Sequence, residues 1–244
     1  MRTKITILSA AALAAGLLSS QAQVFSANIV GYVNKPMVPH FNACANPLDA
    51  NISNSGTNVF PNTGLLDGSA VLTWNGLVFK VNIIDSTSPS GFTDTIGNPS
   101  TAPDLSPGTG FLFDNQAGIT NFTFVGSVHG VLSTGSISNF LALAVPPNVV
   151  QHLVGSVTPV GGGLISSLQC SNTAAARDGD VVQIPNISLT GTLQAYTVRI
   201  FDSTSGTGFT DTIGNPQPEP QIPIASYFIY NGQSTSPAWV QNLP

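Results

Sequence analysis

Two acidic loops of nearly identical sequence hold the residues best suited to chemistry. Each loop places an aspartate and a threonine ahead of a second aspartate: Asp85, Thr87 and Asp94 in the first copy, and Asp202, Thr204 and Asp211 in the second. Carboxylate, hydroxyl and carbonyl oxygens are the ligands that Ca²⁺ prefers. The four aspartates are therefore weak calcium candidates, because two carboxylates are few and the spacing matches no known calcium loop. Two other interpretations stay open: side chains that bond to their own turn backbone, or one ligand or partner surface presented twice.

Recognisable catalytic machinery is not found in the sequence. There is no Gly-x-Ser-x-Gly motif for an activated serine. The three histidines lack zinc-ligand spacing, and Glu219 is the only glutamate, so a glycosidase would need a pair of aspartates. We therefore predict that the protein is not an enzyme, with no catalytic residue, no cofactor and no metal beyond the calcium candidates. A secreted hydrolase is the least favoured alternative.

Aromatic residues suggest a second kind of site. Four of them could form a stacking platform for a sugar on a β-sheet face: Tyr32, Trp74, Phe79 and Phe92. Aromatic residues on strands belong more often to the core. Carbohydrate binding is therefore an alternative function, with Trp74 as a ligand-binding candidate beside the residues of the acidic loops.

The two cysteines, Cys44 and Cys170, occupy different places in the two halves of the chain. Outside the cytosol such a pair can oxidise, and the disulfide would then join the two halves. The alternative is two buried free thiols. The sequence does not choose between them, because it does not show whether the two Cβ atoms meet.

An internal repeat is the strongest pattern in the chain. Residues Phe79–Gly118 and Tyr196–Thr235 align without a gap, and Gly91–Pro99 returns unchanged as Gly208–Pro216. A repeat of this kind marks a duplicated structural unit. We expect a signal peptide over 1–22, a first β module over 23–121 and a second over 122–244.

The elements that carry the loops are predicted to be short strands. Ala70–Trp74 and Leu77–Ile84 flank the hairpin dipeptide Asn75-Gly76. Frequent glycine and proline exclude long helices, and only Ile165–Cys170 and Thr173–Ala176 suggest helical turns. The predicted fold class is all-β, with two tandem β-sandwich or jelly-roll-like modules related by internal duplication.

The N-terminus and the composition predict export. Arg2 and Lys4 precede an uncharged run, and Ser20-Gln21-Ala22 offers small residues for signal-peptide cleavage. The run is too short for a comfortable membrane span. Without residues 1–22, four basic residues face 11 acidic ones, a formal charge of −7, so nucleic acid is excluded as a partner. We expect a protein that is secreted or held at the outer cell surface, with the periplasm as the alternative.

Several short segments together resemble a known group of proteins. They are, in chain order, Ser26–Asn34, Ala45–Leu48, Asp67-Gly68, Thr73–Gly76, Leu105–Phe111, Phe124–Gly126 and Leu153–Ser156. In this order they resemble a group of uncharacterised exported two-repeat β proteins of verrucomicrobial bacteria. The resemblance implies a secreted two-repeat β protein and brings no activity with it.

The leading functional prediction is an exported, non-catalytic cell-surface or extracellular protein with a structural or adhesive role. Only 7% of its residues are charged, which weakens the repulsion between copies, and exposed strand edges favour pairing. The expected partners are the protein itself or other surface components, including polysaccharide.

Overall fold

The computed structural model describes residues 30–50, 52–60, 64–128, 136–138, 151–170, 177–232 and 239–242. The expected signal peptide and the expected helical turn at Thr173–Ala176 lie outside these residues. Within them the chain forms the strands β1–β16 and one short helix, α2 (Gly56–Val59). The all-β class predicted from the sequence is therefore confirmed. None of the helices that the structure describes is long and apolar enough to cross a membrane.

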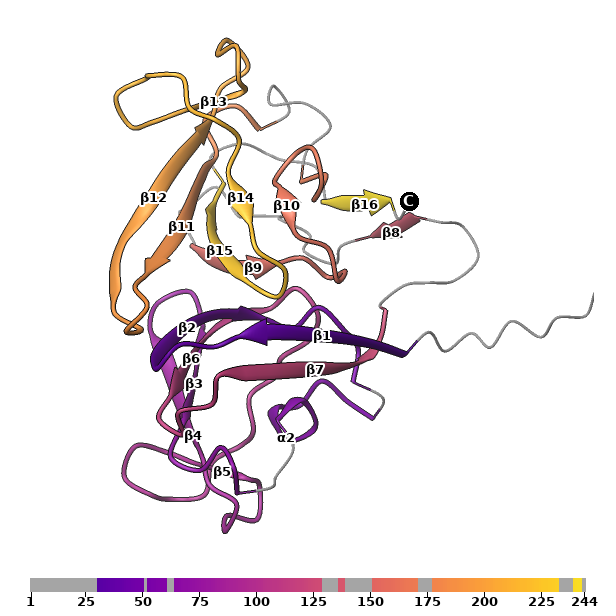
Figure 1. The fold of residues 1–244 in the computed structure, drawn as a ribbon, viewed down its shortest axis with the longest axis vertical. Helices are drawn as coiled ribbons and strands as arrows, with labels where there is room; N and C mark the ends of the chain where they lie inside the picture. The colour runs from indigo at the N-terminus through magenta and orange to yellow at the C-terminus, as the bar shows by residue number, and fades with distance from the viewer. Residues whose placement is uncertain are drawn as a thin grey trace, which may run out of the picture.

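The N-terminal half, defined here as β1–β7, consists of a five-stranded antiparallel sheet and a two-stranded ribbon (Figure 1). Its strands are β1 (Val30–Pro36), β2 (His40–Ala45), β3 (Ala70–Trp74), β4 (Phe79–Ile84), β5 (Phe92–Thr93), β6 (Gly110–Asn115) and β7 (Asn121–Ser127). The sheet order is β2-β6-β3-β4-β5, and β1 pairs with β7. The predicted hairpin is present as β3–β4, with Trp74 opposite Phe79.

The C-terminal half, β8–β16, repeats this arrangement. Its strands are β8 (Ser136–Ser138), β9 (His152–Gly155), β10 (Gly162–Gly163), β11 (Val181–Ile187), β12 (Leu193–Phe201), β13 (Phe209–Thr210), β14 (Gln221–Ile222), β15 (Tyr227–Asn231) and β16 (Val240–Asn242). The sheet order β13-β12-β11-β15-β9 has the same connectivity as that of the N-terminal half, and β8 pairs with β16 as β1 pairs with β7. Only the pair β10–β14 lacks a counterpart among the described strands.

The pairing of β7 with β1 places β7 in the N-terminal half. The boundary expected between 121 and 122 falls at the start of β7, and β7 pairs along its whole length with β1. Phe122 and Phe124 of β7 therefore pack in the core of the N-terminal half. The duplication itself and the module limits stay predictions from the sequence.

Each half has its own hydrophobic core. In the N-terminal half Phe111 and Phe113 from β6 meet Phe122 and Phe124 from β7, and Phe60 stacks on Phe113 with ring centroids 5.3 Å apart. The alternation of buried and exposed residues along β7 is that of a strand with one face on a core. A separate cluster fills the C-terminal half, including Val182, Phe201, Phe209, Phe228 and Trp239.

The two five-stranded sheets also pack on each other. This packing explains why β6 and β15 are apolar on both faces. Leu112 and Ala45 of the N-terminal half meet Leu153, Tyr227 and Ile229 of the C-terminal half in a third cluster, which we call the junction. Alternate residues of β6 and β15 thus point into their own core and into the junction. Strands that are buried on both faces need continuous apolar runs, which is how both strands read in the sequence.

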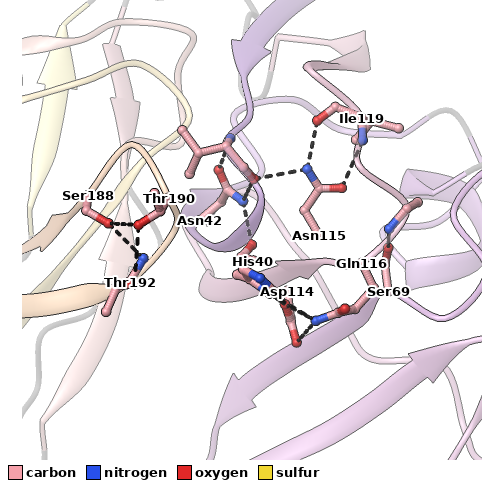
Figure 2. A network of polar contacts seen from close by, with 12 residues as sticks. His40, Asn42, Ser69, Asp114, Asn115, Gln116, Ile119, Ser188, Thr190 and Thr192 are labelled. Carbon is pink, nitrogen blue, oxygen red and sulfur yellow. Dashed lines mark hydrogen bonds and ion pairs between the residues drawn. The ribbon is translucent and has the colours of Figure 1, made fainter.

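The loop between β11 and β12, residues 188–192, closes one side of the junction. Figure 2 shows its Ser188, Thr190 and Thr192 beside the end of β2. The backbone N–H of Phe41 donates to the carbonyl of Gly191 at 3.1 Å. Gly191 has φ +72°, and a Cβ there would lie 1.5 Å from the carbonyl oxygen of Pro39. Only glycine allows this close approach of the two backbones.

Two asparagine side chains hydrogen bond to the turns between β1 and β2 and between β6 and β7 of the N-terminal half (Figure 2). The Asn42 amide donates to the carbonyls of Val38 and His40 and accepts from the N–H of Val38. The Asn115 amide donates to the carbonyls of Val38 and Ile119. Both side chains are buried, so their polar groups are satisfied by turn backbone.

Candidate functional site

The first half of each acidic loop is built from aspartates that accept hydrogen bonds from the loop itself. Thr87 donates to Asp85 Oδ1 from its backbone at 2.9 Å and from its hydroxyl at 2.6 Å. Ser86 donates in the same two ways to Asp67, at 2.9 and 2.5 Å. Asp67 comes from the turn before β3, so this bond ties two turns together.

The second half of the loop is a tight turn around Asp94. Its Oδ1 accepts from the backbone N–H groups of Ile96 at 3.0 Å and Asn98 at 2.9 Å, and the Asn98 amide donates to Oδ2. The turn leaves the Ile96 side chain 81% exposed. An aspartate that bonds the backbone two and four residues ahead is common turn chemistry.

The loop of the C-terminal half repeats these bonds. Thr204 donates twice to Asp202, at 2.9 and 2.6 Å, and Ser203 donates twice to Asp178. The Oδ1 of Asp211 accepts from the N–H groups of residues 213 and 215 at 3.0 and 2.9 Å. The two copies are therefore alike in hydrogen bonding as well as in sequence.

These bonds lower the pKa of the four carboxyl groups. The pKa of Asp85 is lowered mainly by the Thr87 hydroxyl, and that of Asp202 by the Thr204 hydroxyl. The pKa of Asp94 and that of Asp211 are lowered mainly by backbone N–H groups, those of Asn98 and Asn215. No cluster of three or more His, Cys, Asp or Glu side chains able to hold a metal occurs in the described part of the chain. The geometry thus favours the turn interpretation of the loops, and calcium stays a proposal without a ligand cluster to support it.

The second copy of the loop also exposes an isoleucine. Ile213 is 82% exposed, and its N–H donates to Asp211 at 3.0 Å, as that of Ile96 does to Asp94. Figure 1 places the segments that follow β5 and β13, which carry these turns, at opposite ends of the long axis. The molecule therefore carries the same hydrogen-bonded turn, with the same exposed apolar side chain, at both ends.

Trp74 lies at the edge of a pocket between the two halves. Its indole N–H donates to the carbonyl of Gln151 at 2.7 Å, and its ring lies 4.9 Å from that of Phe79 between centroids. The pocket measures about 300 Å³ and includes Thr109 and His152 in its lining. Burial lowers the pKa of His152.

None of the other three aromatic candidates lines this pocket. Phe92 is buried in the core of the N-terminal half, and Tyr32 is exposed on β1, opposite Val125 of β7. Of the four residues considered for a stacking platform, the structure brings only Trp74 and Phe79 together.

Cys44 and Cys170 are free and buried, one in each core. The disulfide alternative is therefore not formed in this structure, and the buried-thiol alternative describes both residues. Burial raises the pKa of Cys44 to about 11 and that of Cys170 to about 12. Thiols of such high pKa are poor nucleophiles.

Sequence reasoning missed two sets of buried charged groups. Arg177 and Asp180 lie in the core of the C-terminal half beside Tyr230. Lys35 is buried on β1 and binds Ser226 of the C-terminal half. A signal for Lys35 was present, because it alternates in sequence with the apolar residues Val33 and Met37.

Comparison with known proteins gives no relative to reason from. No protein-family model, curated protein or solved structure matches the chain. Function must therefore be argued from the residues and their geometry.

Proposed function

We propose that the chain is an exported, non-catalytic cell-surface or extracellular protein that joins copies of itself, or other surface components, through its two ends. The observation that carries this proposal is the repeated turn. Ile96 and Ile213 are held by the same hydrogen bonds, and the segments that carry them, after β5 and β13, lie at opposite ends of the long axis (Figure 1). A molecule with like contacts at both ends can bridge partners or extend a chain of copies.

The strength of such a contact follows from the area buried. A contact between two turns covers one isoleucine side chain from each copy and contributes roughly 3–6 kcal/mol, so a single contact binds weakly. Two turns on one molecule act together when the partner is itself repeated. The low fraction of charged residues, 7%, opposes this association little.

Sedimentation velocity over ~10 µM to ~1 mM tests the proposal, since contacts of about −4 to −7 kcal/mol associate in that range. We expect the average mass to rise with concentration for the wild type and to stay at that of a monomer for the double variant Ile96→Ser, Ile213→Ser. Leu189→Ser is the matched control, because Leu189 is 88% exposed and lies outside both turns. A wild type that stays monomeric throughout contradicts self-assembly.

Carbohydrate binding is the second candidate, favoured by Trp74, which lines a pocket of about 300 Å³ and packs its ring against that of Phe79. Aromatic rings offer large rigid faces for contact. Titration with soluble polysaccharides tests it. Binding that is lost in Trp74→Ala and kept in Tyr32→Ala supports the candidate, and binding that neither variant changes excludes this pocket.

A further inference from the structure

Lys35 breaks the apolar pattern of β1. Val33 and Lys35 share the inward face of β1, Met37 follows in the same alternation just after the strand, and the three are 5%, 8% and 7% exposed. Val33 and Met37 are part of the hydrophobic core, as this face of the strand requires. An ammonium group at such a position needs compensation, because burying a charge costs much more than burying a methyl group.

The compensation visible in the structure is incomplete. Lys35 Nζ donates to the hydroxyl of Ser226 at 2.7 Å. Among the described residues, no carboxylate forms an ion pair with Lys35. An ammonium group carries three donors, and one neutral acceptor satisfies only one of them. Burial accordingly lowers the pKa of Lys35, while the nearby Cys44 raises it.

A pocket of about 220 Å³ lies beside this group, with walls from both halves of the molecule. Most of its lining is apolar: Pro36, Val38, Ala43, Pro185 and Ile187. The polar lining residues are Lys35, Asn42 and Ser226, and the Asn42 amide is already bonded to backbone groups of residues 38 and 40. Lys35 is therefore the one charged group that the lining offers to a ligand.

We propose that this pocket binds a small organic acid, with its carboxylate against Lys35 Nζ and its apolar body between Val38 and Ile187. The carboxylate supplies the charge and the acceptors that Lys35 lacks. A cavity of ~150 Å³ can hold benzene, so about 220 Å³ has room for a ring or a short branched chain with a carboxylate. A bound acid would touch both halves and so strengthen the junction.

Titration with benzoate, and with benzamide as its neutral counterpart, tests this site in the purified full chain. We expect ligand-detected NMR to show saturable binding of benzoate and at least tenfold weaker binding of benzamide. Lys35→Met removes the charge and keeps an unbranched apolar stem, and it should weaken benzoate binding at least tenfold. Equal affinity for benzoate and benzamide, or unchanged benzoate affinity in Lys35→Met, overturns the proposal.

A second variant decides the question if Lys35→Met does not fold. Ile187→Trp keeps Lys35 and fills the pocket from the side of the C-terminal half, so it should abolish benzoate binding. Unchanged benzoate binding in Ile187→Trp overturns the proposal. Inorganic phosphate is the third probe: phosphate that binds as tightly as benzoate overturns the assignment to an acid with an apolar body.

Discussion

The two halves of the molecule share one backbone arrangement and fill it differently. Equivalent positions are fixed by equivalent hydrogen bonds. The N–H of Ile84 donates to the carbonyl of Ser69 at 2.8 Å, and the N–H of Phe201 donates to the carbonyl of Asp180 at 2.9 Å. Ser69 in the N-terminal half therefore corresponds to Asp180 in the C-terminal half.

Equivalent hydrogen bonds and strand register identify two further pairs of corresponding positions in the two halves. The N–H of Ser69 bonds to the carbonyl of residue 66, and that of Asp180 bonds to the carbonyl of residue 177. Position 113 lies opposite Val71, and position 230 lies opposite Val182. Leu66 and Phe113 thus become Arg177 and Tyr230 in the C-terminal half.

The C-terminal half holds its three polar side chains as a connected set. Arg177 Nη1 donates to the Tyr230 hydroxyl at 2.7 Å and lies 3.8 Å from Asp180 Oδ2. The Tyr230 hydroxyl donates to Asp180, and Arg177 Nε donates to the carbonyl of Cys170. All three side chains are fully buried. The comparison teaches that this fold accepts either an apolar or a polar core, provided that the polar groups come together.

Removing one member of the set should have the largest effect. Arg177→Leu places in the C-terminal half the residue that the N-terminal half uses, but it removes the guanidinium group that lies 3.8 Å from the buried Asp180 carboxylate. Breaking a buried pair costs about 3–5 kcal/mol. Urea unfolding should show this loss in the free energy of unfolding.

The triple variant Arg177→Leu, Asp180→Ser, Tyr230→Phe is the control. It reproduces the uncharged set of the N-terminal half, Leu66, Ser69 and Phe113, and replacement of a whole buried ionic set by uncharged residues of similar size is often close to neutral. It should therefore be more stable than Arg177→Leu alone. A triple variant less stable than Arg177→Leu would show that the backbone arrangements of the two halves are not equivalent at these positions.

Gly191→Ala should come next, because it changes a hairpin loop whose backbone is hydrogen bonded to the other half. A left-handed conformation costs an alanine about 1–2 kcal/mol, and the clash with Pro39 adds about 1–3 kcal/mol. Gly97→Ala isolates the first cost, since its φ is +87° and nothing lies within 4 Å of the added Cβ. Equal losses in the free energy of unfolding for both variants would contradict the tight docking.

Phe113→Tyr should destabilise the N-terminal half by about 1–3 kcal/mol, the cost of a buried hydroxyl without a partner. Its equivalent, Tyr230, has Arg177 and Asp180 as partners. Position 113 stacks on Phe60 in a hydrophobic core, and Ser69, at the place of Asp180, has a shorter side chain that already accepts a hydrogen bond from the N–H of Ala117. Thermal unfolding measures the loss. A Phe113→Tyr variant as stable as wild type would show that the core of the N-terminal half accepts a buried hydroxyl as readily as the core of the C-terminal half.

The smallest effects should come from the acidic turns, and they should be equal in the two halves. The folded-state pKa of Asp94 and that of Asp211 lie below the ordinary value of 3.8. The stability they add is therefore present above pH 3.8 and is lost as the pH falls through the lower folded value. Melting curves of Asp94→Asn and Asp211→Asn should differ from wild type at neutral pH and converge with it in acid. A difference that persists below the folded pKa would contradict the charge-based bonds.

The sequence was sufficient where local chemistry decides the structure. The hairpin at Asn75-Gly76 and the strands around it follow from turn residues and apolar runs. The identical turns follow from the repeat, since Asp94 and Asp211 bond only to residues close in sequence. No such local rule reveals contacts between distant segments.

The missed features all depend on such distant contacts. Arg177 and Tyr230 are 53 residues apart and Lys35 and Ser226 are 191 apart, yet each pair is hydrogen bonded. The junction likewise buries Leu112 against Ile229, and one sequence does not show that two sheets pack face to face. Trp74 was recognised as a candidate, whereas its pocket partner His152 needed the fold.

Sedimentation of the two single variants, Ile96→Ser and Ile213→Ser, tests the central claim most directly. If like turns at opposite ends join copies of the protein, each single variant keeps one working end. Both should then stop at dimers at concentrations where the wild type grows larger. Single variants that assemble as far as the wild type, or one variant that abolishes assembly while the other leaves it unchanged, would contradict an assembly built on two equivalent ends.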